Sequence, residues 1–408
     1  MLTLKLAYRN VLRNKRRSFL TLLSMSGGFF LLCVVLSLTE GSYSNIIDIF
    51  TKDRVGHVQI HKGNYLERPS IYKTIKNPTQ IIEALQQKPQ VVSVTPRIFG
   101  ASLAYGKDKT FPAQVIGIDP LLESRTTRLK EKVNSGAYLK NETDSDGYFS
   151  AMIGFTLAKN LNLAVGDELI LISQGIDGSI ANDIFIISAV VGTADSVERN
   201  NVYLSLPAIR EFLSMGDMVH ELAIILENQN QSREFAQEIQ PKLTPDELTA
   251  EPWQVVETAF YKSMQADKQG GYISLSVIIL IVSIGVLNTV LMGTLERTRE
   301  FGVLTAIGTR PHAVFSLIMT ESMILASASC LVGLVISLPV NYYLSVVGIA
   351  MPEPVDMGGM SFDMILGEIS WYTIWLPTVV IVASTLMVSL IPSIKAAKIS
   401  PLSALQAV

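Results

Sequence analysis

Two short motifs contain residue types that bind nucleotides or metals in other proteins. A phosphate-binding loop has the pattern G-x-x-x-x-G-K-[ST], in which backbone N–H groups surround the phosphates. Residues 100–108, GASLAYGKD, have five residues between the glycines and Asp108 after Lys107, so we interpret them as part of a strand or hairpin. His57 and His61 would share one face of a strand, which is more typical of a solvated strand than of a metal site. The sequence has no Ser/His/Asp arrangement and no H-E-x-x-H motif, so we predict no catalytic residues, no metal site and no cofactor in this chain itself.

The most informative polar motif is MGTLERTREFGVLTAIGTRPHAV, at residues 292–314. It begins with alternating acidic and basic residues, continues with apolar residues at helical spacing, and ends at Gly308 and Pro311. Such a segment is typical of a short amphipathic helix that lies along the cytoplasmic face of a membrane. The alternative is a solvated loop whose arginines anchor the membrane topology. The residues alone leave both interpretations open.

Glu321 interrupts an otherwise apolar stretch. A carboxylate inside a membrane span is costly and is a functional hypothesis by default, in which Glu321 pairs with an arginine or a hydroxyl. The alternative places Glu321 near the cytoplasmic boundary, within reach of Arg310 or of lipid headgroups. Neither interpretation implies proton transport. Cys33 and Cys330 lie in apolar runs, where a cysteine behaves as a small hydrophobic residue.

The elements that position these residues belong to a membrane protein. Of the 408 residues, 49% are hydrophobic and only 17% are charged, whereas a soluble domain carries about 25% charged residues. The net charge is −3, and no basic stripe with interleaved aromatic residues follows residue 17, which argues against nucleic-acid binding. A membrane-spanning helix needs about 20 apolar residues. Four stretches meet this requirement: residues 18–39, 271–295, 313–346 and 369–394.

Lysine and arginine in the short flanks predict the orientation of these spans. They gather before the first span, between the second and third, and after the fourth, whereas residues 347–368 carry acidic residues only. We therefore predict that both termini are cytoplasmic and that residues 40–270 lie outside. A cleaved signal peptide is the competing interpretation of the first span, but the apolar run is too long and no A-x-A-like site follows it.

Residues 40–270 have the alternating patterns of a folded α+β domain inserted between the first and second spans. β-Branched runs predict strands at residues 91–95, 113–118, 168–172, 184–191, 202–206 and 221–226. Amphipathic patterns predict helices at residues 79–87, 155–161, 207–214 and 232–243. Apolar residues at helical spacing also extend both neighbouring spans into this segment, which would form a helical stalk; they are Tyr43, Ile46, Ile47 and Phe50 after the first span, and Trp253, Val256, Phe260 and Met264 before the second.

Several strings resemble one known family. AYRNVLRNKRRSFLT (residues 7–21), ERTREFGVLTAIGTRP (296–311) and IPSIKAAKISPLSAL (391–405) are similar to the FtsX-like permeases of ABC transporters. IGFTLAKNLNLAVGDELIL (153–171) resembles a piece of the outer domain of MacB and of the Lol permeases. The resemblance covers the chain from end to end, and it is greatest to the LolC/LolE lipoprotein-releasing permeases.

The resemblance implies a type VII, mechanotransmission transporter in the bacterial inner membrane. In that family two permease chains, identical or related, sit on a dimer of cytoplasmic ABC ATPases, and ATP-driven closure of the ATPases moves the outer domains through stalk helices. The permease is then not an enzyme, and ATP and Mg²⁺ are bound by a separate ATPase subunit. The resemblance places the ATPase-coupling helix at Glu296, Arg297, Arg299, Glu300, Phe301, Gly302 and Leu304.

The resemblance leaves the cargo open. The Lol permeases imply release of lipoproteins, or of another amphipathic cargo, from the bilayer to a periplasmic carrier. MacB-like efflux of peptides or drugs would instead require an adaptor and an outer-membrane channel, and FtsX-like regulation would act on periplasmic hydrolases. If cargo enters between permease chains, the outer ends of the first two spans supply its apolar walls, at Leu36, Leu38, Tyr272 and Leu275.

These predictions divide the chain into successive segments. They are a basic cytoplasmic amphipathic segment (1–17), the first span (18–39), a periplasmic α+β domain with its stalk (40–270), the second span (271–295), a cytoplasmic coupling helix (296–312), the third span (313–346), a short periplasmic loop (347–368), the fourth span (369–394) and a cytoplasmic tail (395–408).

Overall fold

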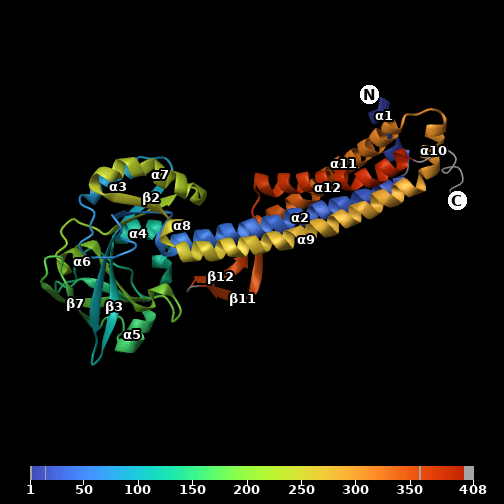
Figure 1. The fold of residues 1–408 in the computed structure, drawn as a ribbon. Helices are drawn as coiled ribbons and strands as arrows, with labels where there is room; N and C mark the ends of the chain where they lie inside the picture. Colours follow the sequence, from blue (N-terminus) through green and yellow to red (C-terminus); the bar gives the residue numbers. More distant parts are fainter. Residues whose placement is uncertain (1, 14, 358–359, 399–408) are drawn as a thin grey trace. The chain divides into compact units, whose positions relative to one another are not determined.

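The computed structural model describes residues 2–13, 15–357 and 360–398. The chain forms two compact units. The helical unit contains residues 265–353 together with the residues before 46 and after 362, and the outer domain contains residues 46–264 and 354–362. Figure 1 shows the helices of the first unit and the mixed sheet and helices of the second. Each unit is described by itself below.

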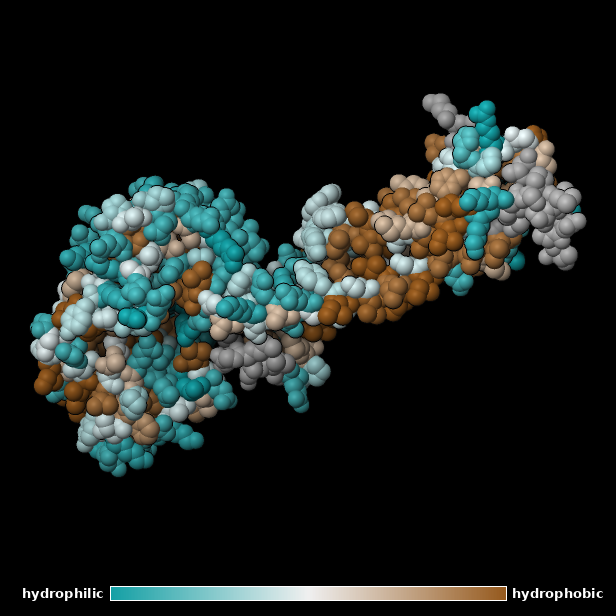
Figure 2. All heavy atoms as spheres, in the orientation of Figure 1, coloured by the Kyte–Doolittle hydropathy of each residue, from teal (hydrophilic) through white to brown (hydrophobic). Residues whose placement is uncertain are grey.

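The helical unit is built from long apolar helices and two short amphipathic ones. Its helices are α1 (Leu2–Arg13), α2 (Lys15–Phe50), α9 (Thr258–Glu296), α10 (Thr298–Ala306), α11 (Pro311–Val346) and α12 (Trp371–Ala397). Among the described residues, α2, α9, α11 and α12 are long and apolar enough to cross a membrane, and apolar side chains cover most of their surface in Figure 2. α2 continues to Phe50, so it includes the extension predicted after the first span. The extension predicted before the second span is divided, because Trp253 and Val256 lie in the separate short helix α8 (Trp253–Val256) and only Phe260 and Met264 lie in α9.

Small residues allow the apolar helices to approach one another closely. Phe29, Cys33, Cys330 and Ile381 form a buried cluster that joins α2, α11 and α12, and both cysteines are free thiols. A side chain at Gly28 would meet Val282 of α9 at 2.7 Å. Glycine at this position therefore permits the close packing of α2 on α9.

The short loop predicted between the third and fourth spans, residues 347–368, contains two paired strands. β11 (Ile349–Met357) pairs with β12 (Met360–Ile365). β-Branched and apolar residues alternate too weakly in this stretch for the strands to be recognised from the sequence. After β12, the backbone N–H of Glu368 donates to the carbonyl of Ser37 (2.9 Å). A side chain at Gly41 would meet the backbone carbonyl of Leu366 at 2.4 Å, so glycine is required for α2 to pass this segment.

The outer domain contains one mixed sheet and the helices that cover it. The strands are β1 (Val58–Lys62), β2 (Val91–Tyr105), β3 (Thr110–Ile118), β4 (Val133–Gly136), β5 (Ser150–Gly154), β6 (Glu168–Gln174), β7 (Ile180–Val191), β8 (Asn201–Ser205), β9 (Glu221–Leu226) and β10 (Leu248–Pro252). The helices are α3 (Pro78–Gln86), α4 (Pro120–Thr126), α5 (Phe155–Leu161), α6 (Leu206–Phe212), α7 (Ser232–Leu243) and α8 (Trp253–Val256). All the strands and helices predicted in this segment are confirmed, with shifted ends.

The sheet closes on itself through the long strand β2. The strand order is β10-β1-β9-β2-β3-β8-β5-β7-β4, and β6 pairs with both β2 and β7. The pairings β2–β3–β8–β5–β7–β6–β2 therefore form a ring, and β9, β1 and β10 extend the sheet beyond it. Two of the pairings, β3 with β8 and β5 with β7, are parallel. Closure pairs the strand edges that would otherwise be exposed.

The apolar residues of the sheet form two cores. The larger core contains residues such as Ile98, Ile153, Phe185 and Leu204, and the smaller one contains Ile116, Leu129, Met152 and Tyr203. A further cluster joins the last turns of α2 to the start of α9, where Ile47, Val55 and Trp253 pack with half-buried residues that include Phe50 and Phe260. The stacked rings of Phe50 and Phe260 are 3.9 Å apart.

Candidate functional site

The segment from residue 296 to residue 311 forms a short helix followed by a tight turn. α10 spans Thr298–Ala306, which decides between the helix and the loop that the sequence left open. Gly308 ends it with φ of +97°, a left-handed conformation that glycine adopts without cost. The N–H of Thr309 then donates to the carbonyl of Leu304 (3.0 Å), and Pro311 begins α11.

The inner face of α10 packs against the ends of two apolar helices. Phe301 is 1% exposed and contacts Val314 and Ile318 of α11 and Ala396 of α12. Leu304 is half-buried against the same cluster, and Gly302 is buried beside Phe301. The guanidinium of Arg297 lies over the Phe301 ring, 5.1 Å from its centre. This packing positions α10 on the helical unit.

A buried ion pair joins the start of α10 to the third apolar helix. Arg297 donates from Nη1 to Oε2 of Glu321 (2.5 Å) and from Nε to Oε2 of Glu300 (3.0 Å). Glu321 is 8% exposed, so its charge is paired by an arginine rather than exposed to solvent. Glu321 therefore has an arginine partner, and that arginine is Arg297 rather than Arg310.

The first helix completes this ion-pair network. Asn10 of α1 donates from Nδ2 to Oε1 of Glu321 (2.6 Å), and Arg13 forms an exposed ion pair with Glu300. Each carboxylate is thus shared between α1 and Arg297. The network ties together α1, the end of α9, α10 and α11, all within the helical unit.

Burial divides the seven residues predicted to contact an ATPase into two groups. Arg297, Phe301 and Gly302 are buried, and Leu304 is half-buried, so they face the helical unit and are unavailable for docking in this conformation. Glu296 and Arg299 are exposed and Glu300 is half-exposed. Two apolar residues that the sequence did not single out, Val303 and Ile307, are 42% and 79% exposed. The outward face of the segment is therefore Glu296, Arg299, Val303 and Ile307.

The four residues predicted as cargo walls do not share one environment. Leu36 is 5% exposed, and Leu275 packs against the buried cluster around Phe29. Leu38 is half-buried, whereas Tyr272 is 55% exposed. Of the four, only Tyr272 presents a largely open side chain on the helical unit, because the helix faces that carry Leu36 and Leu275 are used in packing.

The outer domain has a charge network of its own. Arg97 of β2 donates to Oε1 of Glu123 (2.7 Å) and to Oε1 of Glu221 (2.9 Å). Asp119 positions Glu123, because its carboxylate caps α4 by accepting from the N–H groups of Leu121 and Leu122. Burial alone lowers the pKa of Arg97, but Glu123 and Glu221 outweigh burial and raise it. Arg97 is therefore permanently charged inside the domain.

His61 of β1 and His57, which precedes β1, are both buried. The prediction that they lie on a solvated strand is therefore wrong. His61 is fully buried and contacts Oε2 of Glu221 through Nε2 (3.2 Å). Burial lowers the pKa of His61, but bonds with Glu221 and Glu251 outweigh it and raise the pKa. His57 accepts from the N–H of Leu226 (2.9 Å), and burial lowers its pKa to about 4. β1 is an interior strand between β9 and β10, which a five-residue run cannot reveal.

Sequence reasoning missed Asn10, Arg13 and the whole network around Arg97. The face of α1 that carries Asn10 and buried Ala7 had no apolar signal, because the large apolar residues of α1, such as Leu4 and Leu12, are exposed. Arg97, Glu123 and Glu221 are far apart in the chain, and only the pairing of β2 with β9 brings two of them together. Among the described residues, no group of His, Cys, Asp and Glu is arranged to hold a metal ion.

Both units of the chain resemble known protein families. The model of the MacB-like periplasmic core domain family matches residues 18–242, and that of the FtsX-like permease C-terminal family matches residues 272–401. The chain is 21% identical over 339 residues to the lipoprotein-releasing system transmembrane protein LolE of Haemophilus influenzae, which covers 80% of each chain. It is 19% identical over 413 residues to LolC of Neisseria meningitidis serogroup B, covering 97% of this chain and 95% of LolC.

A third relative is longer, and this chain matches only part of it. The pyoverdine export ATP-binding/permease protein PvdT of Pseudomonas syringae pv. syringae is 23% identical over 423 residues, which cover 98% of this chain but 59% of PvdT. The two family models cover residues 153–171 and 296–311 and parts of residues 7–21 and 391–405, the strings that carry the resemblance. The chain belongs to the FtsX-like permeases with a MacB-like periplasmic core domain, the type VII permeases of ABC transporters.

Proposed function

We propose that this permease couples ATP hydrolysis by a separate cytoplasmic ATPase dimer to motion of its periplasmic domain, and that the motion releases lipoproteins from the inner membrane. Both termini lie in the cytoplasm, because the short basic flanks lie on one side of the predicted spans. A second permease chain, identical or related, completes the transporter. ATP and Mg²⁺ are bound by the ATPase subunit, and this chain contributes no catalytic residue.

The observation that supports coupling is the packing of α10. Phe301 and the Arg297–Glu321 ion pair fix its inner face to α11 and α12. Its outer face presents charged Glu296 and Arg299 beside apolar Val303 and Ile307. An apolar centre with charged residues at its edge is the usual composition of a protein interface. A force applied to this outer face would pass to two apolar helices through buried contacts.

Two of the relatives support lipoprotein release as the first candidate. LolE and LolC, whose names describe a lipoprotein-releasing system, match over 80% and 95% of their own lengths. PvdT matches over 59% of its length, and its name describes an export protein with an ATP-binding part. Efflux with an adaptor and an outer-membrane channel is therefore the second candidate.

Co-purification of the tagged chain from its native membrane, followed by mass spectrometry, tests the proposal. We expect a cytoplasmic ATPase, a second permease chain and triacylated lipoproteins. An ATPase with an adaptor and an outer-membrane channel would move the assignment to efflux, and the absence of any ATPase would refute both candidates.

A substitution on the outer face of α10 locates the ATPase contact. Ile307→Asp places a charge in the apolar centre of this face, and we expect at least about a tenfold loss of bound ATPase, as for a residue at the centre of an interface. Ile180→Asp is the matched control, because Ile180 is 83% exposed and lies on the outer domain. Equal ATPase recovery with both variants would contradict the assignment of this face.

A further inference from the structure

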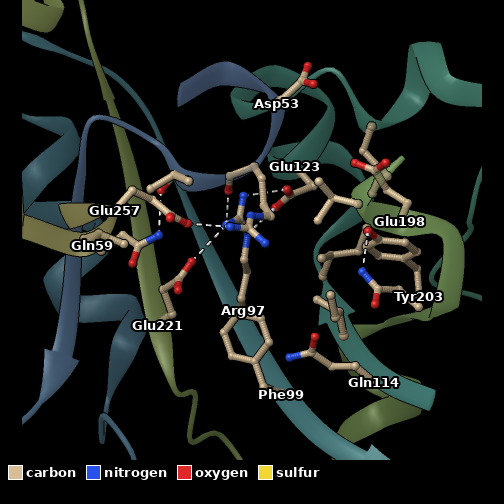
Figure 3. A pocket seen from close by; sticks show the side chains of 18 of the residues that line it. Asp53, Gln59, Arg97, Phe99, Gln114, Glu123, Glu198, Tyr203, Glu221 and Glu257 are labelled. Atoms are coloured by element: carbon tan, nitrogen blue, oxygen red, sulfur yellow. Dashed lines mark hydrogen bonds and ion pairs between the residues drawn. The ribbon is translucent and has the colours of Figure 1, made fainter. Parts of the chain in front are cut away.

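The outer domain contains a cavity that the coupling mechanism does not use. Its volume is about 270 Å³, close to the lower limit of about 300 Å³ for small-molecule sites. Residues from β1, β2, β3 and β8 line it, together with the segments around Asp53 and Glu257. Figure 3 shows Arg97 between Glu123 and Glu221, with Tyr203 and Glu198 at the right of the view, beyond Glu123. All these residues belong to the outer domain.

Carboxylates outnumber cations around this cavity. Arg97 is shared by Glu123 and Glu221. Lys132, beside the cavity, is shared in the same way by Asp53 and Glu198, at 2.8 Å from each. Arg54 pairs with the remaining lining carboxylate, Glu257. Buried Arg97 and half-buried Lys132 therefore each face two carboxylates. The excess charge is negative even when His61 is protonated beside Glu221.

Two buried oxygen atoms at the cavity lack a hydrogen-bond donor among the described residues. Glu198 is 3% exposed, and its Oε1 accepts from Lys132 while Oε2 accepts from nothing. Gln59 is 4% exposed, and its Nε2 donates to the carbonyl of Val55 while Oε1 has no donor. Both residues line the cavity and both are labelled in Figure 3. A buried acceptor without a donor is costly, so each of these two oxygen atoms favours a ligand group that donates a hydrogen bond.

Part of the cavity lining is apolar. It is formed by Phe99, Ile116, Ile118, Leu129 and the ring of Tyr203, which belong to or pack against the smaller core. An aliphatic or aromatic surface of this kind accommodates a hydrocarbon body, and an aromatic ring also attracts an organic cation. The acidic and apolar walls together match a molecule with a cationic end and a short apolar body.

We propose that this cavity binds a small organic cation, a primary ammonium on a short aliphatic chain, with the ammonium donating to Glu198. The ligand supplies the positive charge and the hydrogen-bond donors that the cavity lacks. An anion is disfavoured by the excess of carboxylates, and the described residues offer no cluster suited to a metal ion. A neutral ligand of the same shape would leave the excess charge uncompensated.

Isothermal titration calorimetry of the full chain in detergent, at neutral pH, tests this site. The probe is putrescine, and the comparison ligands are butanediol, which has the same body without charge, and MgCl₂ at equal ionic strength. We expect putrescine to bind and the other two to give no saturable heat. Saturable binding of butanediol with similar affinity, or no binding of putrescine, would overturn the proposal.

Substitutions of Glu198 separate charge from structure. Glu198→Gln keeps the shape but removes the charge, and we expect at least about a tenfold loss of putrescine affinity, typical of a buried charge that loses its partner. Glu198→Asp retains the charge and is expected to retain saturable binding. Glu142→Gln, on an exposed loop of the same domain, is the matched control and should bind as the unsubstituted chain does. Equal loss in the Gln and Asp variants, or no loss in either, would contradict a role for the Glu198 charge.

Discussion

Two buried arginines, one in each unit, bind carboxylates in similar ways but join different kinds of element. Arg97 is 4% exposed and is held between Glu123 and Glu221. Arg297 is 9% exposed and is held between Glu300 and Glu321. Arg97 lies on a strand whose neighbours are already fixed by β pairing with β3 and β9. Arg297 lies between helices that a single buried cluster holds together.

The difference indicates two purposes for similar chemistry. A buried ion pair contributes little net stability over an apolar substitute, but its disruption is costly because one charge remains unpaired. Around Arg97 that cost falls on a domain whose strands are also held by β pairing. Around Arg297 it falls on the packing of α10 against α11 and α12, through which the proposed coupling would pass. Disruption should therefore unfold the first region and uncouple the second.

The largest effect is expected from Arg97→Met. This substitution leaves Glu123 and Glu221 buried without their cation, and we expect a loss of about 3–5 kcal/mol in the free energy of unfolding of the outer domain. Pulse proteolysis of the full chain in detergent across a urea series measures this loss. Arg68→Met, at an exposed position, is the control, and an equal midpoint for both variants would show that the Arg97 network is not structural.

A pH effect distinguishes the outer domain further. The pKa of His57 is about 4 in the folded protein and 6.5 in the unfolded chain. The unfolded chain therefore binds the proton more readily, and stability is present above pH 6.5 and lost as the pH falls toward 4. The loss attributable to His57 is about 3 kcal/mol. His61, whose pKa is raised, has the opposite dependence and loses its contribution as the pH rises.

His57→Asn isolates the contribution of His57 to the pH dependence of stability, because an asparagine Oδ1 can replace Nδ1 as the acceptor for the N–H of Leu226. We expect the variant to lose less stability than the unsubstituted chain between pH 6.5 and 4, and to match it near neutrality. Urea midpoints at several pH values measure the difference. Parallel curves for the two proteins would show that His57 is not the titrating group.

Glu321→Gln is expected to have a smaller energetic effect but a specific functional one. Glutamine still accepts one hydrogen bond, so the loss at the joint is about 1–2 kcal/mol, a factor of about 5–30 in the equilibrium between packed and released α10. With the ATPase that co-purifies with this chain, we expect ATP hydrolysis to continue while the cargo released per ATP falls. Unchanged release per ATP would refute the role of Glu321 in coupling.

The same comparison explains how much could be predicted from the sequence. The four long apolar helices and the paired strands β3, β7 and β9 follow from local patterns, since hydrophobic periodicity reports burial directly. The amphipathic string at residues 292–314 was compatible with both a helix and a loop, and the structure has the helix α10. The inner and outer faces of α10 could not be assigned from the sequence. An arginine such as Arg297 is usually exposed, and its partner Glu321 lies in another helix.

The rest of the fold depends on pairing between distant segments, which one amino-acid sequence does not reveal. Ring closure requires β6 to pair with both β2 and β7, and the cavity depends on β2 and β8 lying on either side of β3. The hairpin of β11 and β12 has weak alternation and was interpreted as a loop. Polar residues buried by such long-range contacts, such as His61 and Glu198, have no local signature.

The smallest effect is expected where the helical network reaches solvent. Arg13 and Glu300 pair with side chains that are 66% and 42% exposed, so salt and water screen the pair, and its contribution is under about 1 kcal/mol. Arg13→Ala should therefore lower cargo release per ATP only slightly, and less so at high ionic strength. Asn10→Ala removes the buried bond to Glu321 and should reduce coupling more than Arg13→Ala does at every salt concentration. If Arg13→Ala has the larger effect, the exposed pair rather than the buried bond joins α1 to the coupling helix.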